Sequence, residues 1–207
     1  MIELLGLPAC GKSTFSATYK SKHPKVINPL EDAIMSGSRF RQNANKILPL
    51  LWFWLHCPRI AMSIFPVVVT MNYVNLYERV KMFVYLYTCL GLIQNSKRNS
   101  PTGKIIFDEG VCQTLWGVAY SIRDYKKPIG KLFDILTPLV ADEIIWFPID
   151  RDVVLERMKQ RTGKGGAKLQ RDILKDESHI DYAIECILYV KKLAEEQGIQ
   201  INTVSYD

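Results

Sequence analysis

The chain has 207 residues, of which 48% are hydrophobic and 23% charged, a composition typical of one globular domain with a full core. A formal net charge of +6 favours anionic partners: nucleotide phosphates, a membrane surface or nucleic acid. The five cysteines are odd in number and far apart without a CxxC pair, which argues against a disulfide framework or zinc site and suggests reduced thiols in the cytoplasm. The start of the chain lacks the basic segment of a secretion signal, so none is expected.

The first fourteen residues predict a short strand that leads into a phosphate-binding loop (P-loop). Residues 6–13 match GxxxxGK followed by serine, in which the glycines let successive backbone N–H groups turn toward phosphate oxygens. A helix expected at 13–20 adds the positive end of its dipole. Lys12 can reach the β- and γ-phosphates, and the Ser13 hydroxyl can bind the accompanying Mg²⁺. We therefore predict an ATP site formed by Gly6, Pro8, Ala9, Cys10, Gly11, Lys12, Ser13 and Thr14.

A second strand is predicted at residues 25–28, ahead of two acidic residues. Because ligands bind at the carboxyl ends of strands in an open α/β sheet, Asp32 is a candidate for binding the substrate or the metal. Capping of the next helix explains Asp32 equally well. Arg39 and Arg41 are candidates for clamping an anionic substrate, with solvent exposure as the alternative.

Residues 47–71 form a long apolar stretch that an arginine and three prolines interrupt, so it does not resemble a spanning helix. We expect two helices packed on the core. The alternative is a surface that faces a membrane, because Trp52 and Trp54 beside basic charge suit an interface. Residues 77–94 have helical apolar spacing and predict a core helix, within an α-helical insertion at about 33–95.

A third strand is predicted at residues 104–107, followed by two carboxylates. Asp108, at the tip of a strand beside the P-loop strand, can hold Mg²⁺ or accept the proton of an attacking hydroxyl. Glu109 is a second candidate for that catalytic role, with helix capping as the alternative. The helix that follows brings Gln113 and Arg123 to the same side, as candidates for contacting the substrate.

The fourth strand, at 143–149, precedes a basic helix. Arg157 and Arg161 are four residues apart on that helix, so they share a face and can converge on one phosphate chain. Glycines and further cations, Lys168 among them, predict a lid at about 157–171 that closes over the site. An exposed, solvated helix is the alternative.

The alternation of strands and helices ends with a helix at 179–197 and a last strand at 199–204. It predicts an α/β, three-layer P-loop NTPase fold as a single domain, residues 1–207. The expected sheet is parallel and five-stranded, with the helical insertion between the second and third strands.

With the P-loop, the Ile-Ile-Phe-Asp-Glu-Gly strand and the late arginines in place, the chain resembles the P-loop nucleoside and nucleoside-monophosphate kinases, loosely the thymidylate-kinase-like members. In that superfamily the first lid arginine stacks on adenine and the second reaches the phosphates, which implies these roles for Arg157 and Arg161. The superfamily's Asp-Arg pair after the third strand is here Asp108-Glu109, so an arginine for the phosphate of a nucleotide acceptor is missing. A weaker resemblance is to P-loop kinase-like proteins found with surface-polysaccharide genes.

The sequence therefore predicts an ATP- and Mg²⁺-dependent phosphotransferase acting on a small-molecule acceptor such as a nucleoside, nucleotide or sugar. Lys12 and Arg161 would stabilise the transferring phosphate, and a carboxylate among Asp108, Glu109 and Asp32 would orient the acceptor hydroxyl. The alternative is a membrane- or partner-associated P-loop NTPase that binds or hydrolyses nucleotide as a switch. Nucleic-acid binding ranks last, because no basic stripe is interleaved with aromatic residues. We expect a cytoplasmic protein, with the inner face of the membrane as a second location.

Overall fold

A computed structural model describes residues 1–23, 39–99, 105–160 and 168–204, and of residues 39–46 it describes the backbone alone. In this part of the chain one parallel sheet has the strand order β2-β1-β3-β4. Its strands are β1 (Ile2–Leu5), β2 (Ile106–Phe107), β3 (Glu143–Trp146) and β4 (Gln200–Thr203). Ile2 of β1 lies opposite both Ile106 and Glu143, so the strand that leads into the P-loop is central.

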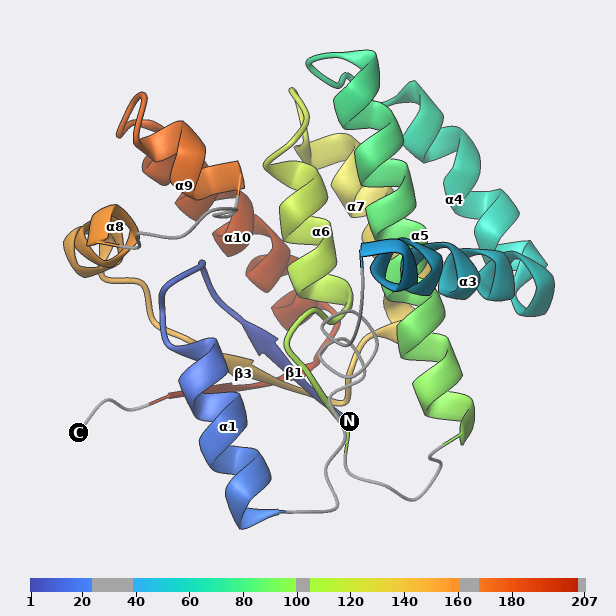
Figure 1. Ribbon diagram of the computed structural model, residues 1–207, viewed down its shortest axis with the longest axis horizontal. Coiled ribbons are helices and arrows are strands. Elements are labelled where there is room, and N and C mark those ends of the chain that lie inside the picture. The colour runs from blue at the N-terminus through green and yellow to red at the C-terminus, as the bar shows by residue number, and fades with distance from the viewer. Residues whose placement is uncertain (24–38, 100–104, 161–167, 205–207) are drawn as a thin grey trace.

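The central strands are apolar runs that become buried after their first residue, as parallel strands covered on both faces require. In Figure 1, α1 (Lys12–Lys22) lies below the sheet, while α6 (Val111–Ala119) and α10 (His179–Glu196) lie above it. The edge strand β4 has one apolar residue, Ile201, and is largely exposed. The predicted α/β architecture with a parallel sheet is confirmed.

The prediction of a five-stranded sheet is not confirmed, because the described residues form a sheet of four strands. The expected strand at 25–28 lies outside the described residues. The other four expected strands are present, although β2 is only two residues long, because Asp108 and Glu109 already form a turn.

The expected helices at 13–20, 77–94 and 179–197 correspond to α1, α5 (Leu76–Asn99) and α10. Gly198, which follows α10, has a φ of 74°, and the helix ends before it as its sequence indicates. The basic helix after β3 is α8 (Arg151–Gln160). The structure also contains α7 (Lys126–Leu136), α9 (Lys168–Ile173) and a 3₁₀ turn at Thr137–Leu139.

The apolar stretch at 47–71 forms two helices, as expected: α3 (Arg39–His56) and α4 (Pro58–Thr70). They separate at Pro58, which occupies the first turn of α4. One face of the pair joins the core through residues such as Phe53 and Ile64. The other face exposes large apolar side chains, including Leu55 at 77%, so the expectation that the stretch packs as core holds for one face only.

No single helix among the described residues has both the length and the apolar character to cross a membrane. Segments 47–56 and 58–70 reach that length and composition only as a pair, and the pair is bent by 116°.

Helices α3 and α5 cross at very close range. A Cβ placed on Gly91 of α5 would lie 2.0 Å from the carbonyl oxygen of Pro49 in α3. A glycine is therefore required at this crossing, and α3 determines how α5 is positioned over the sheet.

Candidate functional site

The P-loop between β1 and α1 is a tightly curled turn. Ala9 and Gly11 have φ values of 71° and 100°, in the left-handed region. A Cβ on Gly6 would lie 2.6 Å from Sγ of Cys10 and 2.8 Å from Cβ of Phe147, so only glycine fits there. Ser13, in the first turn of α1, is exposed to solvent and lines the adjoining pocket.

Lys12 lies across this loop. Its ammonium group donates to the carbonyl oxygen of Gly6 and, at 3.3 Å, to that of Leu7. The positive charge is therefore held at the loop, next to the start of α1, where the helix dipole also favours an anion.

A buried chain of hydrogen bonds supports the loop from beneath. The Gly6 N–H donates to Oε1 of Gln113 at 3.2 Å, and the Gln113 N–H donates to Oε1 of Glu3 at 2.7 Å. Glu3 is fully buried, and burial raises the pKa of its carboxyl to about 8, against the lowering effect of nearby backbone N–H groups at the start of α6. Room for this carboxyl exists because residue 110 is glycine: a Cβ there would lie 2.2 Å from Cδ of Glu3.

Two carboxylates follow β2 and line the pocket, Asp108 and Glu109. Oε2 of Glu109 accepts a hydrogen bond from the hydroxyl of Tyr85, which comes from α5. Burial raises the pKa of Glu109; the Tyr85 hydrogen bond and the charge of Lys12 act in the opposite direction, and Asp108 raises it further. Glu109 is therefore a fixed carboxylate, half-buried at the pocket wall, with raised basicity.

One pocket of about 1370 Å³ joins these features. It runs from the P-loop along a wall formed by α5 and α6, and Arg157 of α8 and Lys168 of α9 also contribute to it. Pockets for single small ligands usually measure about 300–1,000 Å³. The volume is therefore sufficient for a nucleotide together with a second small molecule.

Most of the predicted site residues that the structure describes lie around this pocket. Gly6 and Cys10 are buried within the loop. Arg157 is exposed and donates to the carbonyl oxygen of Ala9 at 3.4 Å. The predicted residues that line the pocket are Pro8, Ala9, Gly11, Lys12, Ser13, Thr14, Asp108, Glu109, Gln113 and Arg157.

The remaining predicted residues are placed elsewhere or are not described. Arg123 lies exposed after α6, outside the residues that line the pocket. Asp32 and Arg161 lie outside the described residues, as do the side chains of Arg39 and Arg41. Their predicted roles stay predictions.

Sequence reasoning missed the wall formed by α5. Lys81, Tyr85 and Thr88 line the pocket from one face of this helix, with the spacing i, i+4, i+7. A polar stripe of that spacing within an apolar helix was a usable signal. Glu3 was also missed, although a single acid within an apolar strand is unusual and points to a buried, hydrogen-bonded carboxyl.

The residues present fit a magnesium ion bound together with a nucleotide. Mg²⁺ usually takes one or two carboxylates and completes its shell with substrate phosphates and water. The Ser13 hydroxyl and the Asp108 carboxylate both line the pocket and supply this kind of donor set. Within the described ranges, no cluster of three or more His, Cys, Asp or Glu side chains could hold a metal by itself.

No family model and no curated protein matches the sequence. Solved structures do match the fold. A deoxyadenosine kinase from M. mycoides with bound dATP aligns with a TM-score of 0.55 at 15% identity, over 99% of this chain and 89% of that one. The same kinase with the products dCMP and dCDP gives 0.53, at 14% identity and the same coverage.

The thymidylate kinase of Candida albicans gives a TM-score of 0.56 at 15% identity, over 98% of this chain and 82% of that one. The structural neighbours of this chain are thus P-loop nucleoside and nucleotide kinases. The fold that the resemblance implies is confirmed at nearly full length.

Proposed function

We propose that the protein is an ATP- and Mg²⁺-dependent phosphotransferase that acts on a small-molecule acceptor such as a nucleoside, nucleotide or sugar. The observation that carries the proposal is the single pocket that joins the P-loop, the two carboxylates after β2 and a compartment between α5 and α6. A nucleotide on the P-loop would leave that compartment free for an acceptor. Structural neighbours with bound dATP, and with dCMP and dCDP, support the reading.

In this proposal the P-loop amides and Lys12 hold the donor phosphates, with Arg157 and Arg161 at the nucleotide. Ser13 and Asp108 would hold Mg²⁺, which neutralises phosphate charge when bound. The acceptor hydroxyl gives its proton to Glu109 while its oxygen bonds to the γ-phosphorus. The bond from that phosphorus to the β-phosphate oxygen breaks, and ADP leaves.

The decisive experiment incubates the protein with ATP, Mg²⁺ and panels of nucleosides, nucleotides and sugars, and identifies products by mass spectrometry. We expect one phosphorylated acceptor and ADP in equal amounts. Lys12→Ala should lower ATP affinity at least tenfold in calorimetry without unfolding the protein, because its charge serves phosphate binding. Lys22→Ala, on the exposed end of the same helix, is the matched control and should bind ATP like the parent. Unchanged ATP binding by Lys12→Ala would contradict the P-loop assignment.

The alternative is a nucleotide-dependent switch that docks on a membrane or partner. The apolar face of α3 and α4 favours it, since Leu48, Leu55 and Met62 are more than half exposed. A switch should release only inorganic phosphate, at a slow rate that no acceptor increases. A kinase should show acceptor-dependent ATP consumption. Five free cysteines agree with the cytoplasmic setting that both readings assume.

A further inference from the structure

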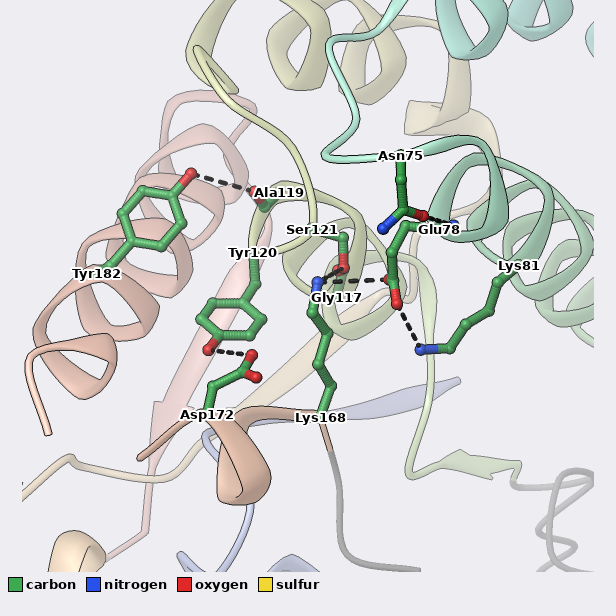
Figure 2. A network of polar contacts seen from close by, with 10 residues as sticks. All are labelled: Asn75, Glu78, Lys81, Gly117, Ala119, Tyr120, Ser121, Lys168, Asp172 and Tyr182. Carbon is green, nitrogen blue, oxygen red and sulfur yellow. Dashed lines mark hydrogen bonds and ion pairs between the residues drawn. The ribbon is translucent and has the colours of Figure 1, made fainter. Parts of the chain in front are cut away.

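Two lysines from different elements meet at one end of the pocket. Lys81 of α5 and Lys168 of α9 both line the pocket, and both pair with Glu78 (Figure 2). The Nζ–Oε distances to Glu78 are 3.5 Å for Lys81 and 3.4 Å for Lys168. Lys168 also donates to Oγ of Ser121 at 3.4 Å and lies 5.5 Å from the ring centre of Tyr120. Two cations thus share the Glu78 carboxylate, while the other carboxylate of this network, Asp172, accepts from the Tyr120 hydroxyl at 3.0 Å.

The two helices of the pocket wall show where this cluster lies relative to the reacting end. On α5, Lys81 precedes Tyr85 by one turn, and Tyr85 holds Glu109. On the other helix, Gly117 lies beside Tyr85, where a Cβ would be 3.2 Å from its ring, and Ser121 follows four residues later. Four helical residues rise by about 6 Å. The backbone of Lys81 therefore lies about 6 Å along α5 from that of Tyr85, the residue that holds Glu109.

The lysines retain donors that can face the pocket. An ammonium group has three N–H donors, while the contacts of both lysines are at the long limit for hydrogen bonds. Among the described residues that line the pocket, the carboxylates are Asp108 and Glu109, at the other end. Of the two carboxylates in the network of Figure 2, Glu78 is the one that pairs with the lysines, so it competes with an added anion.

We propose that the acceptor carries an anionic group, a phosphate or a carboxylate, that binds between Lys81 and Lys168. Its reacting hydroxyl lies at Asp108 and Glu109, beyond the turn of α5 that separates Lys81 from Tyr85. Between the two ends, the side chains of Met82, Tyr85 and Trp116 line a compartment that suits a ring. The acceptor class is therefore a hydroxylated ring compound with an anionic substituent, such as a sugar phosphate or a sugar acid. This inference rests on the proposed kinase function.

The test saturates the P-loop with a non-hydrolysable ATP analogue and Mg²⁺, so that added anions meet only the remaining pocket. Inorganic phosphate and acetate are then titrated separately, and calorimetry together with tryptophan fluorescence, to which Trp116 in the pocket contributes, reports binding. We expect saturable binding of one anion, and the stronger of the two identifies the substituent as phosphate or carboxylate. Lys81→Met and Lys168→Met should each weaken it at least tenfold, because each removes one of two charges that contact it.

The Glu78→Gln variant tests whether the two lysines bind an anion or only hold α5 and α9 together through Glu78. If the lysines bind an anion, removing the competing carboxylate should tighten phosphate or acetate binding several-fold. Lys168→Arg keeps the charge and should bind within about threefold of the parent, and Lys192→Met, in an exposed pair on α10, should change nothing. The proposal is overturned if neither anion binds saturably, if the lysine variants bind like the parent, or if Glu78→Gln weakens binding as the lysine variants do.

Turnover measurements then distinguish a failure of this inference from a failure of the proposed kinase function. With an anionic acceptor, Lys81→Met and Lys168→Met should raise the acceptor KM at least tenfold and change kcat less than threefold. A preference for uncharged acceptors, with phosphoryl transfer intact, would reject the anionic acceptor and leave the kinase standing. Absence of any phosphoryl transfer would reject the kinase, and the direct titration would still decide whether the lysine pair binds an anion.

Discussion

The two walls of the pocket are built differently. The P-loop wall consists mainly of backbone, shaped by Gly6, where any side chain would clash, and by Ala9 and Gly11 with positive φ. The opposite wall consists of side chains on one face of α5, and that face points into the pocket because α3 crosses α5 at Gly91. A backbone site is specified locally by a motif. A side-chain site depends on how helices far apart in the chain pack together. The side chains of the α5 wall can therefore vary in chemistry, whereas the motif fixes the backbone of the P-loop wall.

Gly110→Ala should have the largest effect, because the new Cβ would lie 2.2 Å from Cδ of a buried carboxyl, Glu3, under the P-loop wall. We expect a loss of about 3 kcal/mol in the free energy of unfolding, the upper part of the range for overpacking. Urea denaturation measures it. Gly130→Ala in α7 is the control, since its nearest atom is the Tyr189 hydroxyl oxygen at 3.3 Å. Equal losses in both variants would show that the contact with Glu3 does not decide the outcome.

The buried carboxyl beneath the same wall should make stability depend on pH. The pKa of Glu3 is raised from its ordinary value of 4.5 to about 8 in the folded protein, so the folded state holds this proton more tightly. The stabilisation is complete below about pH 4.5 and is lost as the pH rises through about 8. Relative to Glu3→Gln, the parent should lose on the order of 2 kcal/mol between about pH 6 and pH 8. Parallel pH profiles of unfolding for the two proteins would exclude this account.

Gly91→Ala tests the other wall. The clash with the Pro49 carbonyl oxygen costs about 3 kcal/mol, and alanine returns about 1 kcal/mol of helix propensity, so we expect a net loss of about 2 kcal/mol. Because α5 would shift and the P-loop would not, acceptor affinity should fall while ATP affinity stays within twofold. Calorimetry with each ligand measures both. A matching loss of ATP affinity would mean that the two walls are not independent.

Tyr85→Phe should have the smallest effect and the most local one. It removes the hydroxyl that donates to Glu109, and we expect kcat to fall about tenfold, close to the lower limit for one hydrogen bond to a charged group. Tyr189→Phe removes a hydroxyl that donates to the carbonyl oxygen of Lys126 on an exposed face and should leave kcat unchanged. Steady-state rates of both variants at saturating ATP provide the comparison.

The same difference between the walls explains what could be predicted. The P-loop, the apolar strands and the carboxylates at the end of β2 are signalled by neighbouring residues, and the structure places them as expected. The face of α5 that lines the pocket is not signalled by neighbouring residues, because the apolar spacing of this helix fits several rotations about its axis. Val80, expected in the core, is 55% exposed, and Lys81 next to it lines the pocket.

Contacts between residues far apart in the chain could not be predicted from the sequence either. Lys168 was assigned to a lid by its charge, but its pairing with Glu78 joins residues 90 apart in the chain. Glu3 is stabilised by the N–H of Gln113, 110 residues away. The sequence shows each partner and does not show that they meet.

The central position of β1 also sets the order in which the protein can be completed during synthesis. β1 emerges first, yet its partners in the sheet are at Ile106 and Glu143. At about 5–20 residues per second, a ribosome makes residue 146 roughly 7 to 28 seconds after residue 5. Helices α3, α4 and α5 emerge in that interval and are held together by short-range contacts, so they can form early. The nucleotide loop, although made before these helices, is then among the last parts to reach its final shape, and an incomplete chain released before β3 would carry the motif without the site.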